Sequence, residues 1–369
     1  MARVRDEEDN RVDPVKIIDL AARLGLDKST VSRALNNRPG VAPETREKIT
    51  RMAQEMGYRP NVHGQQLRGW KSTTLGLVLG GNVPHLSSLF FGPFTLKLYG
   101  AAAERGYDLL ILSHEHHPDE SIADVLVRRG AFGGILLGWQ SDDVLAAMSD
   151  SPLPCIQVDN YAADFPTLDY VCSDNRTGAY EITRHLLDQG HRRLAYIADR
   201  RPVDEQGEVA MMMGLSPFRE RYEGFQQVVT EAGAQEIVCD DNPQLPEESA
   251  RQLLSRPNAP TAIVAASDGV AASVSQVAQS MGRQVPRDLS LTGFDDVDPH
   301  LVEKLKLTTV RVDQLAQAHA AVGSLLDSDA ERDERIECRI PTELIVRGST
   351  APPPDPAAVP KQRLSAATN

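Results

Sequence analysis

The chain has 369 residues and a net charge of −13, and 25% of its residues are charged. This length allows two or three domains. Because no run of about eighteen apolar residues occurs, we expect no membrane-spanning segment. Residues 1–13 are charged and lack an apolar core, so they do not resemble a signal peptide and are expected to form a disordered tail. A cytoplasmic protein is therefore expected.

The charge is distributed unevenly along the chain. Residues 14–71 contain 11 Lys and Arg against 5 Asp and Glu, a net charge of +6, whereas residues 72–369 carry −17. A cationic segment can neutralise phosphates while the acidic remainder repels them. This pattern predicts that nucleic acid is bound at one end of the chain only.

Three short helices are predicted between residues 14 and 61. Apolar residues recur at helical spacing from Ile17 to Leu24, and Gly25 then ends the helix in a left-handed cap. A second helix with an apolar face follows after a short turn, and Pro43 opens a third. Two short helices joined by a tight glycine turn are typical of a helix-turn-helix.

This segment resembles the headpiece of the LacI/GalR family of bacterial transcription regulators. The matching stretches are STVSRALN, PETREKI, GYRPN and QQLRG. The resemblance implies a DNA-binding headpiece over residues 14–61 and a hinge over residues 62–72. The chain departs from the family at Ala42, where a serine usually precedes the third helix, and the lost cap costs about 1 kcal/mol.

The second helix is expected to place its N-terminal residues in the major groove of double-stranded DNA. Arg33 can donate to both acceptors of a guanine, which is worth about 1–3 kcal/mol of discrimination. Lys28 and Ser29 stand where the family has its variable base-reading pair, although Lys28 could instead contact a phosphate. Contacts to the DNA backbone are expected from Thr30, Ser32, Asn36, Tyr58 and Asn61.

Leu67 is an apolar residue in the otherwise polar hinge GQQLRG. The family resemblance implies that it is a wedge that enters the minor groove at the operator centre, with Arg68 against that groove. The alternative is a leucine that rests on the body. With glycines at positions 64 and 69, the hinge should become helical only when it is paired with a partner's copy on DNA.

Short apolar runs alternate with helical segments from residue 74 onward, which predicts parallel sheets covered on both faces. The expected strands are 75–80, 108–113, 133–138, 154–159, 170–174, 194–199, 262–267 and 289–296, and the expected helices include 95–105, 178–189, 219–232, 247–255 and 269–281. The stretch is too long for one α/β unit, so two doubly wound subdomains are expected.

The family resemblance continues through the body, for example in FRERYEGF, PTAIVAASDG and LTGFDD. It implies an α/β periplasmic-binding-protein-like core of two subdomains around a cleft, with chain crossings near Asp174, Leu307 and Ile336. The first subdomain would comprise residues 73–174 and 308–335, and the second residues 175–306 and 336–350. The Pro- and Ala-rich residues 351–369 are expected to be unstructured.

A small-molecule effector is expected beyond the carboxyl ends of the strands. The resemblance implies that Phe90 and Phe91 stack on it, that Arg221 grips it, and that Asp295 accepts its hydrogens. Each charged residue has an alternative role: Arg221 could form a salt bridge at the cleft edge, and Asp295 could cap a strand end. Ser267 replaces an asparagine common in sugar-binding members. A sugar is favoured, while a nucleobase or nucleoside stays open.

These features predict a repressor that binds a pseudo-palindromic operator as a homodimer and responds to an effector. A solute-binding protein of similar fold is the alternative, although the headpiece opposes it. We expect neither an enzyme nor a cofactor, since no catalytic constellation is recognisable. The histidines at 114, 116 and 117 lack the companions that a metal site needs. The loop 200–217 contains three methionines and has no assigned role.

Overall fold

The computed structural model describes residues 17–35, 39–56, 72–80, 89–114, 117, 119–198, 216–239, 245–327 and 335–354. Contacts within the chain divide it into two units, residues 1–72 and residues 73–369. None of the described helices is both long and apolar enough to cross a membrane.

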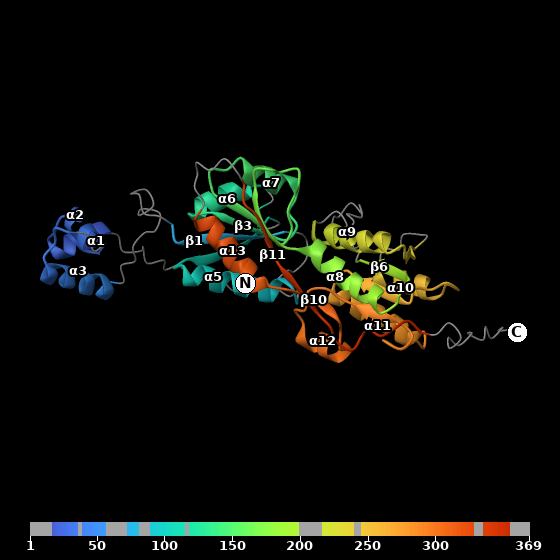
Figure 1. Cartoon of the computed structure of the whole chain (residues 1–369). Helices are drawn as coiled ribbons and strands as arrows, with labels where there is room; N and C mark the ends of the chain where they lie inside the picture. The colour runs from blue at the N-terminus through green and yellow to red at the C-terminus, as the bar shows by residue number, and fades with distance from the viewer. Residues whose placement is uncertain are drawn as a thin grey trace, which may run out of the picture. The chain divides into compact units, whose positions relative to one another are not determined.

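The N-terminal unit contains the three predicted helices (Figure 1): α1 (Ile17–Leu24), α2 (Lys28–Leu35) and α3 (Pro43–Glu55). Gly25, with φ +63°, ends α1 as expected. The helices bury a small shared core consisting of Leu20, Ala21, Val31, Ala34, Ile49 and Ala53. A core of this size gives only marginal stability, so the ends of the helices matter for this unit.

The start of α3 lacks a side-chain cap. Ala42 occupies the N-cap position with extended backbone angles, φ −59° and ψ 145°, and Pro43 follows in the first turn. Alanine has no oxygen to accept a hydrogen bond from the first amides of the helix. The predicted departure from the family pattern therefore corresponds to a missing interaction.

The first subdomain of the body is a six-stranded parallel sheet in the order β11-β5-β4-β3-β1-β2. Helices α5 and α13 pack on one face and α6 and α7 on the other (Figure 1). Its elements are β1 (Thr74–Leu79), α5 (Phe91–Glu104), β2 (Asp108–Ser113), α6 (Ile122–Arg129), β3 (Gly134–Leu137), α7 (Asp142–Ser149), β4 (Cys155–Val158), β5 (Asp169–Ser173), α13 (Gln314–Leu326) and β11 (Glu337–Ile340).

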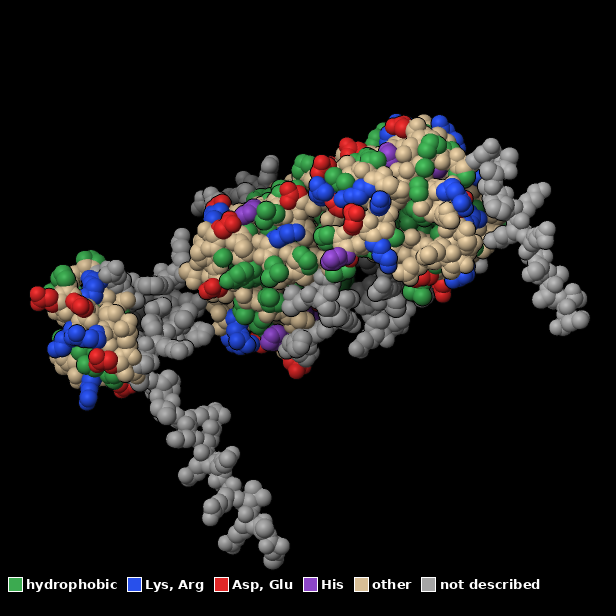
Figure 2. Space-filling view, turned by 90° about the horizontal axis from the view of Figure 1, so that it is seen from below, with side chains coloured by type: hydrophobic (Ala, Val, Ile, Leu, Met, Phe, Trp, Pro, Cys, Tyr) green, Lys and Arg blue, Asp and Glu red, His purple; other side chains and the backbone are tan. Residues whose placement is uncertain are grey.

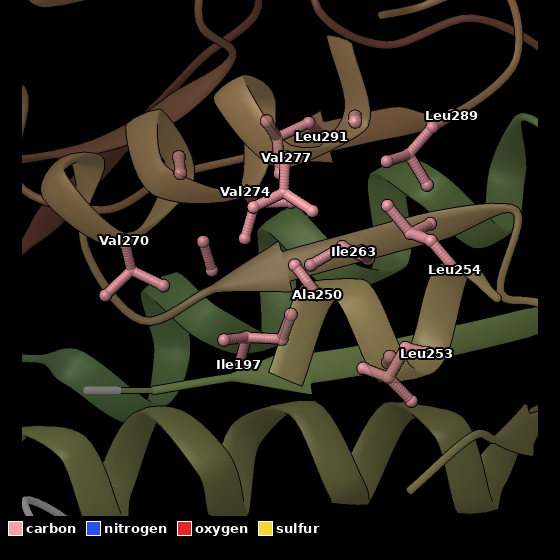
Figure 3. Close-up of a cluster of buried hydrophobic side chains, with 14 of the residues drawn as sticks. Ile197, Ala250, Leu253, Leu254, Ile263, Val270, Val274, Val277, Leu289 and Leu291 are labelled. Atoms are coloured by element: carbon pink, nitrogen blue, oxygen red, sulfur yellow. The ribbon is translucent and has the colours of Figure 1, made fainter. Parts of the chain in front are cut away.

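The second subdomain is a four-stranded parallel sheet in the order β7-β6-β8-β9. Its elements are α8 (Asn175–Asp188), β6 (Arg193–Ile197), α9 (Ser216–Glu231), β7 (Gln235–Glu236), α10 (Pro246–Leu254), β8 (Ala262–Ala265), α11 (Asp268–Ser280), β9 (Ser290–Thr292) and α12 (Pro299–Leu305). Helices α8 and α9 cover one face. On the other, Ile263 of β8 packs among side chains from α10 and α11 (Figure 3). The predicted fold of two doubly wound subdomains is confirmed.

Two of the three chain crossings lie later than expected. Strand β10 (Thr309–Val312) pairs with β12 (Thr342–Ile345) and is bridged to the end of β9, so it belongs with the second subdomain. Strand β11 pairs in parallel with β5 in the first sheet. The crossings therefore follow β10 and Ile340, rather than Leu307 and Ile336, because each short strand extends a sheet that is already formed.

The C-terminal segment is bound to the second subdomain at a place where a disordered tail was expected. The carbonyl oxygen of Ala351 accepts hydrogen bonds from His191 Nε2 at 2.8 Å and from Ser290 Oγ at 2.9 Å. Ser349 Oγ donates to the carbonyl of Leu291 at 2.6 Å. The start of the expected tail is thus part of the fold through Ala351, and residues 355–369 lie outside the described part of the chain.

We predict that Ala42→Ser stabilises the headpiece by about 1 kcal/mol, because the serine hydroxyl would accept a hydrogen bond from an early amide of α3. In the full chain, hydrogen exchange of the α3 amides should slow by about fivefold. The exposed Ala22 in α1 offers a control. Ala22→Ser should leave exchange unchanged or slightly faster, and equal exchange in Ala42→Ser and wild type would contradict the missing-cap interpretation.

Candidate functional site

Arg221 is the central charged residue of the cleft side of the second subdomain. It lies on the first turns of α9 with only 4% of its surface exposed. Its Nε donates to Asn175 Oδ1 at 2.9 Å, Nη1 donates to the carbonyl of Ala266 at 2.6 Å, and Nη2 lies 3.0 Å from Asp295 Oδ1. The guanidinium also stacks over the Phe294 ring at 3.8 Å. These contacts leave the arginine in one orientation.

Asp295 belongs to the same subdomain as Arg221, so the pair does not lie across the cleft. The salt bridge that the sequence left open as an alternative for Arg221 is present, and Asp295 is its partner. Asp295 and Asp296 both have positive φ, 114° and 54°. Two successive non-glycine residues in this region are strained, which is common where the surrounding structure must aim a side chain.

Asp268 holds the strained loop in place from the start of α11. Its carboxylate accepts hydrogen bonds from Thr309 Oγ1 at 2.6 Å and from the Asp296 amide at 2.8 Å. Burial, and then the nearby charge of Asp295, raise the pKa of Asp268. Burial also raises the pKa of Asp295, although Arg221 opposes the shift. Asp268 and Asp295 are therefore two neighbouring carboxyl groups, and among the described residues Arg221 is paired with Asp295.

Asp159 contributes a further carboxylate from the first subdomain. It follows β4 with φ 72°, and its amide donates to the carbonyl of Val171 at 3.0 Å. Burial raises its pKa to about 7, while Arg221 lowers this pKa and Asp295 raises it further. The pKa of Asp159 therefore responds to the charges of two residues that belong to the other subdomain. Our sequence reasoning missed it, although an aspartate directly after the run PCIQV was a usable signal.

The two phenylalanines lie at the start of α5, where the subdomains meet. Phe90 packs against the hydrophobic clusters of both subdomains, and its carbonyl accepts a hydrogen bond from Gln314 Nε2 at 3.1 Å. The Phe91 ring lies against Gly138 at the end of β3. The centroids of the Phe90 and Phe91 rings are 5.0 Å apart. Ser267 is the N-cap of α11, and its hydroxyl accepts from the Val270 amide at 3.2 Å.

The predicted DNA-contacting residues are divided between described and undescribed parts of the chain. On α2, Val31 and Ala34 are buried, so the helix exposes the opposite face, with Lys28, Ser29 and Arg33 on it. Thr30 and Ser32 are half-buried at its edges. The other predicted contacts lie outside the described residues: Asn36, Tyr58, Asn61, Leu67 and Arg68.

Comparisons with known proteins agree with both units. Residues 16–61 match the family of bacterial regulatory proteins named after lacI, and residues 183–350 match a periplasmic-binding-protein-like domain. The chain is 32% identical over 350 residues to the transcriptional regulator DegA of Bacillus subtilis, covering 91% of this chain and 98% of DegA. This chain belongs to the LacI family.

Two further relatives agree with this assignment. The transcriptional repressor CytR of Escherichia coli K12 is 29% identical over 90% of this chain and 95% of CytR. The structure of the regulator CelR in complex with cellobiose superposes with a TM-score of 0.61 at 26% identity, covering 91% of this chain and 99% of CelR. This LacI-family protein is a DNA-binding transcriptional regulator, and these relatives are regulators rather than enzymes.

A hollow lies beside the chain crossings of this LacI-family body. It has a volume of about 520 Å³ and is lined by Lys97 of α5, by residues 311–315 around the second crossing and by residues 341–343 around the third. Asp296 lines it too, whereas its neighbour Asp295 binds Arg221. The strained loop therefore connects the arginine site with the second and third chain crossings.

The raised pKa of Asp159 predicts that stability falls as pH rises. An unfolded aspartate has a pKa near 3.9, so between about pH 4 and 7 the folded protein retains a proton that the unfolded chain has lost. Asp159→Asn removes this dependence, and asparagine tolerates the positive φ. Between pH 5 and pH 8, the free energy of unfolding of the variant should rise by about 2–3 kcal/mol relative to that of the wild type, measured by urea unfolding.

Exposed Asp164, in the loop that follows Asp159, is the matched control. Asp164→Asn should change the free energy of unfolding by the same amount at both pH values, because its carboxylate is already in water. Parallel pH profiles for wild type and Asp159→Asn would show that Asp159 ionises normally.

Proposed function

We propose that this protein is a cytoplasmic repressor whose homodimer binds a pseudo-palindromic operator and is switched by a small effector in the cleft. The observation that carries the proposal is that the loop after β4, which holds Asp159, contacts the start of α9, the helix of Arg221: the Ser216 amide donates to Asn160 Oδ1 at 2.9 Å, and Arg221 is paired with Asp295. A ligand that contacts Asp159, Arg221 and Asp295 would couple its own binding to the relative position of the subdomains. Such coupling is typically worth about 1–3 kcal/mol.

The charges of the cleft favour a neutral effector rich in hydroxyl groups. Arg221 is already bound by Asp295, Asn175 and the carbonyl of Ala266, so it offers little to an additional anion. Carboxylates accept hydrogen bonds from hydroxyls and repel phosphates. The bound cellobiose of CelR supports a sugar as the first candidate. A nucleoside is the second, because Phe90 and Phe91 could stack on a base.

In the proposed complex with operator DNA, Arg33 reads a guanine, and Lys28 and Ser29 read neighbouring bases. Their exposure on α2 supports these roles. Thr30, Ser32, Asn36, Tyr58 and Asn61 are assigned to phosphate and sugar contacts, which position the headpiece without reading sequence. Leu67 and Arg68 are assigned to the minor groove at the operator centre. The two-fold symmetry of the operator would match that of the dimer.

An apolar surface on α5 supports the dimer. Leu96 is 70% exposed and Tyr99 is 51% exposed, and residues three apart on a helix lie on the same side. Figure 2 shows hydrophobic side chains exposed among charged ones on the face of the body that it presents. We propose that this side of α5 contacts a second copy of the chain in the homodimer. Residues 351–369 have no leucine heptad, so we propose no higher assembly.

Arg33→Ala should weaken and broaden operator recognition. The operator would be selected by the wild-type protein from a random pool of double-stranded DNA, and binding would be measured by fluorescence anisotropy at fixed salt. Loss of the bidentate contact should cost about 1–3 kcal/mol on the selected site and much less on unrelated DNA. Arg23→Ala, in the last turn of α1, should change the affinity for the selected site and for unrelated DNA by similar factors. Unchanged preference in Arg33→Ala would refute the base-reading role.

A thermal-shift screen of the full chain against neutral sugars, nucleosides and their phosphates tests the effector proposal. A ligand at 100 times its dissociation constant should stabilise the body by about 2.7 kcal/mol. We expect a neutral sugar to bind and to change operator affinity, whereas its phosphate should bind at least tenfold more weakly. A ligand that binds but leaves operator affinity unchanged would instead favour a solute-binding protein. Preference for the phosphate would overturn the charge argument.

A further inference from the structure

A polar network separate from the Arg221 site joins the two subdomains. It consists of Asn160, Tyr161 and Arg339 from the first subdomain and Ser216 and Glu220 from the second. We call these five residues the brace. Tyr161 belongs to the loop after β4, Arg339 to the edge strand β11, and both residues of the second subdomain to the first turns of α9.

One half of the brace consists of three hydrogen bonds, two of them donated by backbone amides and one by the Ser216 hydroxyl. The Ser216 amide donates to Asn160 Oδ1 at 2.9 Å, and the Ser216 hydroxyl donates to the same oxygen at 3.1 Å. In the other direction, the Tyr161 amide donates to Ser216 Oγ at 2.9 Å. The first amide of α9 is thus satisfied by a residue of the opposite subdomain, so separation of the subdomains would leave this helix end without its partner.

The other half of the brace is centred on the carboxylate of Glu220, which is only 6% exposed. Its Oε1 accepts hydrogen bonds from Tyr161 Oη at 2.6 Å and from Arg339 Nη1 at 2.8 Å. Its Oε2 is buried and has no hydrogen-bond partner among the described residues. The stability of this buried charge in the closed arrangement therefore depends on two groups that belong to the other subdomain.

Contacts within the first subdomain hold Tyr161 and Arg339, the two partners of Glu220, in position independently of Glu220. The Tyr161 ring stacks on Tyr170 with centroids 4.3 Å apart and an interplanar angle of 13°. Arg339 Nη2 donates to both tyrosine hydroxyls, at 3.2 Å and 3.3 Å. Burial alone would lower the pKa of Arg339, but its hydrogen bonds to Tyr161 and Glu220 raise it, so the cation persists.

A polar contact of this kind suits a reversible closure. Separation of a buried ion pair returns both charges to water, and this hydration offsets most of the attraction that is lost. Separation of an apolar contact of equal size would expose apolar surface to water, and hydration would not offset the loss. The brace can therefore select one arrangement of the subdomains while leaving the other within a few kcal/mol.

We propose that the brace holds the cleft closed in the absence of effector and thereby positions Arg221. Glu220 and Arg221 are consecutive on α9, so the contact that fixes the start of this helix also fixes the arginine beside it. The proposal rests on the proposed effector-driven switch, because it sets the closed–open equilibrium that an effector would shift. Glu220 and Arg339 act here as positioning residues and are not assigned contacts with the effector.

Hydrogen exchange of the full chain without effector or DNA tests the brace directly. The amides of Tyr161 and Ser216 donate across the cleft and should exchange only when it opens. Glu220→Gln removes the buried charge, and Arg339→Met removes its partner from a half-exposed position. In both variants these two amides should exchange about tenfold faster, while the amides of β8 should keep the wild-type rate.

Arg335→Met is the matched control, because Arg335 lies on the chain just before β11 and pairs with Glu337 inside the first subdomain. It should leave the two amides at the wild-type rate. Wild-type exchange in Arg339→Met would overturn the brace, and so would a rise of equal size at β8, which would indicate general loss of stability. Since no effector is present, failure here is distinguishable from failure to find an effector in the thermal-shift screen.

Discussion

The geometry of the body depends on the need to pair one buried cation. Arg221 is almost fully removed from water, where an isolated charge would cost several kcal/mol. Its two hydrogen-bond acceptors come from the start of α8 and the end of β8, and its salt-bridge partner comes from the loop after β9. The carboxyl ends of separate strands and the first turn of a helix are thereby held around one guanidinium. The strained loop at Asp295 is tolerated because it supplies the matching charge.

In the proposed switch, the same requirement would make the cleft responsive to an effector. Asp159 is near Arg221 but belongs to the opposite subdomain, so its ionisation depends on how closely the subdomains approach. The crossings after β5, β10 and β11 allow that approach to change without unfolding either sheet. Small rearrangements at an effector site are converted into subdomain movement because packed layers have discrete arrangements and do not deform continuously. In the proposed switch, the charges that the two subdomains bring together would thus link the ligand to the movement of the subdomains.

Most of the fold could be predicted from the sequence, because strands buried on both faces are nearly uniform apolar runs, and such runs as 133–138 stand out between polar helices. The crossings could not be placed correctly because β10 and β11 are short, and nothing local indicates which sheet they join. Arg221 and Asp295 were identified only through family motifs, and their mutual salt bridge needed coordinates. Asp159 was missed because a single aspartate after a strand is common in turns.

The headpiece and the body differ in how their stability is built, and this difference bears on regulation. The body buries two clusters in each subdomain, whereas the headpiece has one small core and a helix start without a cap. A coupling of about 1–3 kcal/mol changes little in a unit that is stable by much more than that amount. In a unit whose folded and unfolded states are close in free energy, the same coupling decides which state is populated. In the proposed switch, a marginal headpiece would therefore allow a weak signal from the cleft to govern DNA binding.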